Sequence, residues 1–336
     1  MNSIKIKDVA RLAGVSPACV SLVLNNKPYV SPETREKIYK AIKKLNYRPN
    51  IIARSLRKKE TTTIGLVLPD ITNPFFPEVA RGVETRAKEY GFSVILCNSD
   101  ADPVLEKESI EILLAKQVDG LILTSAHRKN DLIENLEKDI PVVLVNRELF
   151  PGKFDFVGID NLNSAKTMVR HLLKLGHKRI AFIKGEPASS ASADRYKGYI
   201  LALKEAGIIY SKNLVKTGYL KYEGGYQAIQ SLLASSSPPT AIFCANDMMA
   251  LGALDACKDK GIKVPQDVAI VGFDDIWLAS LKGIELTTIR QPRYLMGVNA
   301  VDLLIERITG KRDKIKRLIL PSELVVRKTC GTDYRK

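Results

Sequence analysis

From residue 61 onward, short apolar segments alternate with amphipathic segments of helical length, and this alternation restricts the fold more than any other feature of the sequence. The expected strands are residues 64–68, 93–97, 120–123, 142–145, 179–183, 240–243 and 268–271, and the expected helices are 78–90, 105–116, 164–175, 194–206, 223–233 and 247–260. Short strands separated by helices form parallel sheets with helices on both faces. The segment from residue 61 to residue 336 is too long for one compact sheet. We therefore expect a two-lobed α/β core with doubly wound parallel sheets.

The formal net charge of +15 is concentrated at the N-terminal end of the chain. Residues 1–60 contain 14 lysines and arginines but only 4 acidic residues, so they carry +10 of this charge. Such asymmetry indicates a module that binds nucleic acid or an acidic membrane surface. A solvated lysine-rich surface would have the same composition, so the spacing of the apolar residues has to decide.

Three short helices are predicted within this basic segment. Residues 6–13 place four apolar side chains on one helical face, and a glycine follows as a turn residue. Ser16-Pro17 and Ser31-Pro32 each mark a helix start, because serine caps a first turn and proline suits its first position. Two short helices joined by a glycine-containing turn form a helix-turn-helix. We therefore predict an N-terminal all-α DNA-binding domain.

A further short helix is predicted after these three, within residues 46–57. Asn50 could cap it, and Ala53 and Leu56 belong to its apolar side. A helix of about eight residues is not stable in isolation because nucleation is costly. We therefore expect this segment to fold only where DNA and a second copy of the chain stabilise it.

The stretch IKDVARLAGVSPACVSLVLNNKPYVSPETREKIYKAIKKLNYRPNIIARSL resembles the headpiece and hinge helix of the LacI/GalR family of bacterial transcriptional regulators, and the similarity continues through the rest of the chain. The resemblance implies a homodimer on a pseudo-palindromic double-stranded operator, with higher assembly left open, and a hinge leucine that wedges between base pairs. Leu56 matches that leucine. The DNA-binding positions implied by the resemblance are Ser16, Pro17, Ala18, Ser21, Leu22, Asn25, Asn50, Ala53 and Leu56.

Three of these positions depart from the usual chemistry of base recognition. Pro17, Ala18 and Leu22 cannot donate side-chain hydrogen bonds, and the family often has an arginine or another polar residue where Leu22 stands. Direct readout usually depends on arginine, asparagine or glutamine. We therefore expect apolar contacts with thymine methyl groups and a larger share of specificity from DNA deformation.

Polar and aromatic side chains follow the expected strands, at the edge where open α/β sheets bind ligands. Each one alone is more often a helix cap or a turn residue. Together they could hold a sugar, because amides, carboxylates and guanidinium groups bind hydroxyls while aromatic faces cover C–H groups. The candidate ligand-binding residues are Asn73, Phe75, Phe76, Asn146, Arg147, Asp160, Ser189, Arg195, Leu220, Asn246, Asp274 and Gln291.

The core is similar to periplasmic sugar-binding proteins of the ribose/galactose type, whose two-lobed fold the LacI/GalR family shares. Asn146 stands where the ribose-type relatives usually have aspartate, Leu220 where they often have an aromatic lid, and Ser189 where purine-responsive members have arginine. The resemblance implies a small-molecule effector, a sugar or sugar derivative. A purine-responsive regulator and a carbon-catabolite regulator that answers to a phosphorylated carrier protein stay open. A different class of protein also stays open as an alternative: a sugar receptor or an enzyme without DNA binding.

Motifs for catalysis, cofactors and metals are missing from the sequence. It contains no G-x-G-x-x-G after a strand, no phosphate-binding P-loop, no H-E-x-x-H and no G-x-S-x-G. The three histidines are isolated, and the five cysteines lie far apart without a C-x-x-C pair. We expect no enzymatic activity, no cofactor, no metal and no disulfide framework. Without an apolar export signal or an apolar run of about 18 residues, we also expect no membrane partner and a cytoplasmic location.

The predicted domain boundaries follow from these segments. Residues 1–48 form the headpiece, 49–60 the hinge helix and linker, and 61–336 the ligand-binding and dimerisation core. Within the core we assign residues 61–161 and 292–321 to an N-lobe and residues 162–291 and 322–336 to a C-lobe. Three connecting segments between the lobes would act as a hinge, and closure on a ligand would rotate one lobe against the other.

Overall fold

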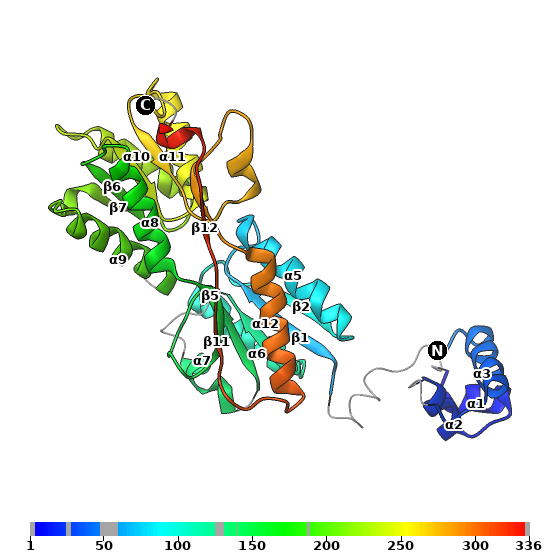
Figure 1. Ribbon diagram of the computed structural model, residues 1–336. Coiled ribbons are helices and arrows are strands. Elements are labelled where there is room, and N and C mark those ends of the chain that lie inside the picture. The colour runs from blue at the N-terminus through cyan, green and yellow to red at the C-terminus, as the bar shows by residue number, and fades with distance from the viewer. Residues whose placement is uncertain are drawn as a thin grey trace. The chain divides into compact units, whose positions relative to one another are not determined.

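The computed structural model describes residues 4–24, 28–47, 60–124, 131–138, 140–186 and 189–332. The chain divides into two compact units, Met1–Thr61 and Thr62–Lys336, and each is described by itself (Figure 1). The predicted hinge helix, with Asn50, Ala53 and Leu56, lies outside the described residues, and so does Asn25.

The smaller unit contains the three predicted helices, α1 (Ile6–Ala13), α2 (Pro17–Leu24) and α3 (Pro32–Lys44). The serine starts are confirmed, because Ser16 Oγ accepts a hydrogen bond from Cys19 N at 3.2 Å and Ser31 Oγ accepts one from Thr34 N at 3.3 Å. Gly14 ends α1 in the left-handed region at φ 67°. The apolar faces meet in a small core of buried side chains: Val9, Ala10, Val20, Val23, Val30, Ile38 and Ala41.

The larger unit begins with a sheet of six parallel strands in the order β11-β5-β4-β3-β1-β2. Its strands are β1 (Thr63–Leu68), β2 (Ser93–Asn98), β3 (Gly120–Leu123), β4 (Val142–Val145), β5 (Asp155–Ile159) and β11 (Arg317–Leu320). Helices α5 (Phe75–Glu89) and α12 (Arg293–Ile308) pack together on one face, while α6 (Pro103–Ala115) and α7 (Asp131–Asn135) cover the other. All six strands lie within the segments assigned above to the N-lobe.

A second parallel sheet has the order β7-β6-β8-β9. It is made of β6 (Ile180–Lys184), β7 (Val215–Thr217), β8 (Ala241–Cys244) and β9 (Ala269–Val271). The helix pair α8 (Asn161–Lys174) and α9 (Ser190–Glu205) packs together, as does the pair α10 (Tyr222–Leu233) and α11 (Asp247–Asp259). This sheet and its helices make the C-lobe.

The chain passes between the two lobes three times: from β5 into α8, from β10 (Thr288–Arg290) into α12, and from β11 into β12 (Glu323–Val325). Strands β10 and β12 pair antiparallel, with Ile289 opposite Leu324. In Figure 1 the red C-terminal segment accordingly runs along both lobes. The connection is therefore made of the paired strands β10 and β12 and the starts of two helices, α8 and α12.

The observed elements extend the expected ones. Helix α5 starts at Phe75, three residues before the expected start, because Asn73 Oδ1 accepts a hydrogen bond from Phe75 N at 3.1 Å and so begins the helix earlier. The strands expected from apolar runs are all present. Helix α12 and the short strands β7, β11 and β12 are not among the predicted elements. These strands are only partly buried, and β11 contains a run of just three apolar residues, Leu318–Leu320.

Candidate functional site

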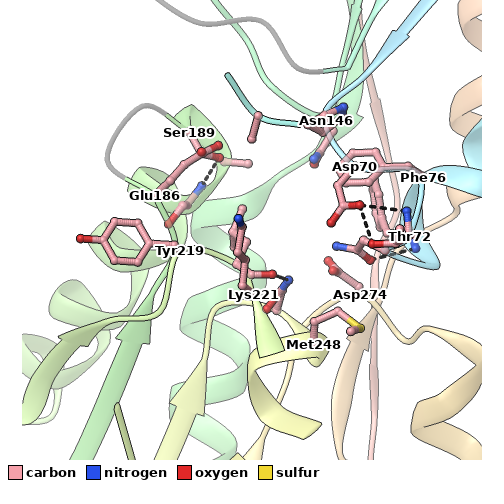
Figure 2. A pocket seen from close by; sticks show the side chains of 18 of the residues that line it. Asp70, Thr72, Phe76, Asn146, Glu186, Ser189, Tyr219, Lys221, Met248 and Asp274 are labelled. Carbon is pink, nitrogen blue, oxygen red and sulfur yellow. Dashed lines mark hydrogen bonds between the residues drawn. The ribbon is translucent and has the colours of Figure 1, made fainter. Parts of the chain in front are cut away.

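A cavity of about 570 Å³ lies within the larger unit and is lined by residues of both lobes. Its lining comes from loops and helix starts that follow β1, β2 and β4 in the N-lobe and β6, β7, β8 and β9 in the C-lobe. In Figure 2, Asp70, Thr72, Phe76 and Asn146 lie on one side of the space, and Glu186, Ser189 and Tyr219 lie on the other. Its size is ordinary for a small-molecule site.

Ten of the twelve candidate ligand-binding residues line this cavity. They are Asn73, Phe75, Phe76, Asn146, Arg147, Ser189, Arg195, Leu220, Asn246 and Asp274. The carboxyl ends of parallel strands meet at one edge of each sheet, which is why residues from such distant parts of the sequence come together here.

Asp160 and Gln291 are absent from that lining. The Asp160 carboxylate instead caps α8, because its Oδ1 accepts a hydrogen bond from Asn163 N at 2.9 Å. Gln291 is buried behind the cavity wall, where its Nε2 donates to Asp274 Oδ1 at 2.6 Å. The geometry therefore gives Asp160 a structural task and gives Gln291 an indirect one, through Asp274.

Two aromatic rings form an apolar part of the cavity wall. Phe75 and Phe76 open helix α5, and their ring centroids lie 5.0 Å apart in an edge-to-face arrangement. Both side chains are almost fully buried. Aromatic rings that line a cavity in this way can pack against the C–H side of a sugar.

Asn146 supplies a polar group with an open bonding position. The residue follows β4 at a positive φ of 66°, and its side chain is 9% exposed. Its buried Oδ1 has no hydrogen-bond partner among the described residues. A buried acceptor without a partner is costly, so a donor from a bound molecule would stabilise this side chain.

Two arginines are buried in the cavity wall, and each one faces a carboxylate. The Arg147 guanidinium pairs with Glu186 across the two lobes. Arg195 Nε donates to Asn161 Oδ1 at 2.8 Å and its Nη1 to the Ala245 carbonyl oxygen at 2.6 Å, while Nη1 lies 3.5 Å from Asp274 Oδ1. Burial lowers the pKa of Arg195 to about 10, so the guanidinium stays charged at neutral pH.

The carboxylates behind Arg195 are buried as well. Burial raises the pKa of Asp274 to about 6, although the Arg195 charge and the hydrogen bond from Gln291 oppose the increase. Burial and the nearby Asp274 charge raise the pKa of Asp247 to about 7, against the hydrogen bonds donated by Thr288 and Ile276. The C-lobe side of the cavity therefore includes two buried carboxyl groups whose pKa values are raised toward neutral pH.

The structure adds lining residues that the sequence analysis did not select, chiefly Asp70, Asp100, Glu186, Tyr219 and Lys221. Asp70 and Asp100 follow strands β1 and β2, which are paired with Leu68 opposite Asn98. The strand-end criterion could have found both. The partnership of Glu186 with Arg147 has no sequence signal, because the two residues belong to different lobes.

The candidate DNA-binding surface lies on α2 in the smaller unit. Ser16, Pro17 and Ala18 are exposed, Leu22 is 37% exposed, and Ser21 is half-buried. Buried Val20 and Val23 hold the opposite side of this helix in the core. Helix α2 thus presents the predicted base-contacting side chains away from the core of its own unit.

The basic surface of α3 is partly neutralised within the helix. Lys37 pairs with Glu33 and Lys40 with Glu36, each at 2.8 Å and at i,i+4 spacing. The positive charges that remain for phosphate contacts in this helix are mainly Lys43 and Lys44 near its C-terminal end.

A helix-turn-helix unit followed by a two-lobed α/β unit with a polar cavity defines a ligand-binding regulator of transcription. Residues 5–50 match the family described as bacterial regulatory proteins, lacI family, and residues 61–328 match periplasmic binding proteins and the sugar binding domain of the LacI family. The chain belongs to the LacI family. It is a DNA-binding transcriptional regulator, not an enzyme.

Full-length relatives are similar over nearly the whole chain. The HTH-type transcriptional regulator RegA of Clostridium saccharobutylicum is 41% identical over 96% of this chain and 98% of its own. The ribose operon repressor of Escherichia coli (strain K12) is 39% identical, over 96% of this chain and 98% of its own chain. A crystal structure of the Lac repressor dimer bound to operator and the anti-inducer ONPF matches 98% of this chain and 99% of its own, with 30% identity and a TM-score of 0.89.

Within the described ranges, no helix is both long enough and apolar enough to span a bilayer. The same part of the chain holds no group of three or more side chains placed to bind a metal ion.

Proposed function

We propose that this protein represses transcription by binding operator DNA as a homodimer, and that a sugar bound between the lobes changes its affinity for the operator. The observation that carries the proposal is the cavity itself. It joins an aromatic wall in one lobe to hydrogen-bonding groups from both lobes, in a chain that also has a helix-turn-helix unit.

The cavity chemistry supports a sugar as the effector. Phe75 and Phe76 offer ring faces, and Asn146 offers a buried acceptor without a partner. A pyranose or furanose presents C–H groups on one side and hydroxyl donors around its edge, so it can satisfy both. The relative described as a ribose operon repressor is consistent with this class.

An exposed apolar surface on the N-lobe supports dimerisation. Strand β2 is the last strand of its sheet, and its Ile95 and Leu96 are exposed. The neighbouring helix α6 exposes Val104, Leu105 and Ile112. An apolar sheet edge that stays in water invites pairing with another chain, and a second copy would bury it.

The dimer can be tested by placing a charge in this surface. Leu96→Glu should convert the protein to monomers in analytical ultracentrifugation and lower operator affinity by about tenfold or more, because two half-sites no longer bind together. Ile209→Glu is the matched control, since Ile209 is 91% exposed in the C-lobe. An unchanged sedimentation coefficient for Leu96→Glu would refute this choice of surface.

Effector control would come from lobe closure. The three connecting segments join the lobes at one edge, so a ligand that contacts both lobes stabilises the closed arrangement. If closure changes operator affinity by some factor, operator DNA must change sugar affinity by the same factor. Equality of the two factors is a stringent test of the mechanism.

The decisive experiment combines DNA selection with a sugar panel. Full-length protein is used to select duplexes from a random library, and fluorescence anisotropy then measures operator affinity with and without each pentose, hexose and disaccharide. Specific binding must persist at salt concentrations that remove binding to random DNA. If no sugar changes operator affinity, the sugar effector is refuted, and a phosphorylated carrier protein becomes the next effector to test.

Substitution at Asn146 links that result to the cavity. Asn146→Leu removes the unpartnered acceptor. It should lower the affinity for the active sugar by about tenfold, which is the usual effect of one lost hydrogen bond. Asn213→Leu, at an exposed position in the C-lobe, is the control and should leave the affinity unchanged. Equal affinities for the two variants would show that the sugar binds elsewhere.

A further inference from the structure

We infer that the cavity selects an unphosphorylated sugar and rejects its phosphate esters. This inference rests on the proposed function and specifies the chemical class of its effector. Its basis is that both buried arginines and three of the four helix starts around the cavity already contact groups of the chain itself, and that most of the remaining charges there are negative.

The first buried cation is Arg147. Its side chain is only 3% exposed, and it pairs directly with Glu186, whose own side chain is 15% exposed. A buried guanidinium paired with a carboxylate is neutral as a unit. Arg147 is therefore not a free cation for a phosphate group.

The second buried cation is Arg195, whose Nε and Nη1 atoms have partners in the chain. It donates to Asn161 and to the Ala245 carbonyl oxygen, and its charge is opposed by Asp274 at 3.5 Å. Its guanidinium also stacks on the Phe273 ring, 3.7 Å from the centroid. These contacts hold the group in the wall, where it can contact a hydroxyl but cannot fold around a phosphate.

Helix starts are the other common anion sites, because their first amides point outward and the helix dipole favours negative charge. Four helices start at this cavity, and three of them, α5, α9 and α11, have a side chain on a first-turn amide. The fourth, α10, has no side-chain cap, but its first turn carries the carboxylate of Glu223. Asn73 Oδ1 accepts from Phe75 N, Ser189 Oγ from Ser192 N, and Asn246 Oδ1 from Met249 N. The residues selected from the sequence as ligand contacts thus occupy the positions that a phosphate would need.

The remaining charges around the cavity are predominantly negative. The lining includes the carboxylates of Asp70, Asp100 and Glu223, for which no ion pair with a described residue is found, against the single exposed ammonium group of Lys221. Asp70 accepts hydrogen bonds from Thr72 through one oxygen, which leaves its other oxygen toward the cavity. A phosphate ester, which carries nearly two negative charges at neutral pH, would be repelled by this group.

The uncharged groups complete the specificity. Asn146 Oδ1 is an acceptor without a partner, and it requires a donor such as a hydroxyl. A phosphate dianion offers only acceptors and would leave that oxygen unsatisfied. The cavity thus favours a neutral, hydroxyl-rich ligand for two reasons: Asn146 Oδ1 needs a donor, and the carboxylates of the lining repel an anion.

The test compares sugars with their own phosphate esters on the full-length protein. D-Ribose and ribose 5-phosphate, D-glucose and glucose 6-phosphate, and D-fructose and fructose 1-phosphate are titrated by calorimetry, with inorganic phosphate alone as a further probe. We expect at least one parent sugar to bind, its ester to bind at least tenfold more weakly, and inorganic phosphate to give no heat of binding.

A charge-removing variant tests the cause. Glu186→Gln removes the carboxylate paired directly with Arg147 and leaves only the buried Glu106 charge near it. The affinity of the ester relative to that of the parent sugar should therefore increase at least fivefold. Glu84→Gln, at an exposed position on α5 outside the cavity, should leave the ratio unchanged. Asp70→Asn should shift the ratio in the same direction as Glu186→Gln, and it keeps the inference testable if Glu186→Gln does not fold.

The outcomes separate the inference from the proposed function. An ester that binds as tightly as its parent sugar, or an unchanged ratio in both Glu186→Gln and Asp70→Asn, overturns the exclusion of phosphate but leaves the sugar effector standing. Failure of every sugar and every ester to bind removes the sugar effector itself, and the inference with it.

Discussion

Replacing Arg195 with methionine tests whether this buried charge supports the cavity wall. Methionine keeps much of the side-chain volume but removes the positive charge that faces Asp274 and the donors to Asn161 and the Ala245 carbonyl oxygen. Breaking a buried ion pair by removing one partner typically costs about 3–5 kcal/mol. For a unit of this size, such a loss lowers the melting temperature by roughly 10 °C.

The destabilisation should depend on pH with a definite sign. Arg195 lowers the pKa of Asp274, which burial holds at about 6, so its removal raises that pKa further. A carboxyl whose pKa is higher in the folded state than in the unfolded state favours folding as the pH falls through the folded value. Arg195→Met should therefore be most destabilising at pH 8 and less so at pH 5, by about 1.4 kcal/mol for each unit of added pKa shift.

Two further variants make the measurement decisive. Arg195→Met combined with Asp274→Asn removes the unpaired charge, so it should recover part of the lost stability at pH 8 and lose the pH dependence that Arg195→Met adds through Asp274. Lys197→Met, at an exposed position on the same helix, should change the unfolding free energy by less than about 0.5 kcal/mol. Urea unfolding between pH 5 and pH 8 measures all three, and a double variant no more stable than Arg195→Met would refute the charge-based explanation.

Three other substitutions have clear expected outcomes. Ile38→Ala removes a fully buried side chain from the small three-helix core and should cost about 2–5 kcal/mol, so operator binding is lost while calorimetric ligand binding is retained. Gly297→Ala places a Cβ 2.2 Å from the Val79 carbonyl oxygen where α5 and α12 cross, so the melting temperature of the larger unit should fall by an amount equivalent to about 1–3 kcal/mol. In the parent protein the buried Asp247 carboxyl ionises as the pH rises through about 7, and the free energy of unfolding falls there. Asp247→Asn should therefore make the free energy of unfolding less dependent on pH in this range. A urea midpoint with the parent's pH profile would contradict this last expectation.

The sequence predicts much of the fold because its signals are local. Ser16-Pro17 and Ser31-Pro32 mark helix starts within four residues of chain, and the central strands are buried apolar runs. Strand β11 also has three apolar residues in a row, but it is not a buried strand, because its exposure alternates, and its partner β5 lies far away in the sequence, with Arg317 opposite Phe156. Its place in the sheet is decided by tertiary pairing.

In the candidate site, too, some features follow from local sequence signals and others depend on tertiary contacts. Asn73, Asn146, Arg195 and Asp274 could be located from sequence because each follows a strand. The ion pair between Arg147 and Glu186 depends on how the lobes face each other, which no local pattern encodes. The sequence allowed either helix capping or a place at the ligand site for these polar residues, and the structure shows that Asn73, Ser189 and Asn246 both cap helices and line the cavity.

The contribution of both chain ends to the N-lobe has a consequence for its synthesis. Edge strand β11 and covering helix α12 come from the last part of the chain, whereas β1 to β5 are made first. A nascent N-lobe would therefore have one sheet face covered by α5 alone and one sheet edge unpaired until the C-lobe has been translated. Proteins that shield nascent apolar surface should matter more for this chain than for one whose lobes fold in order.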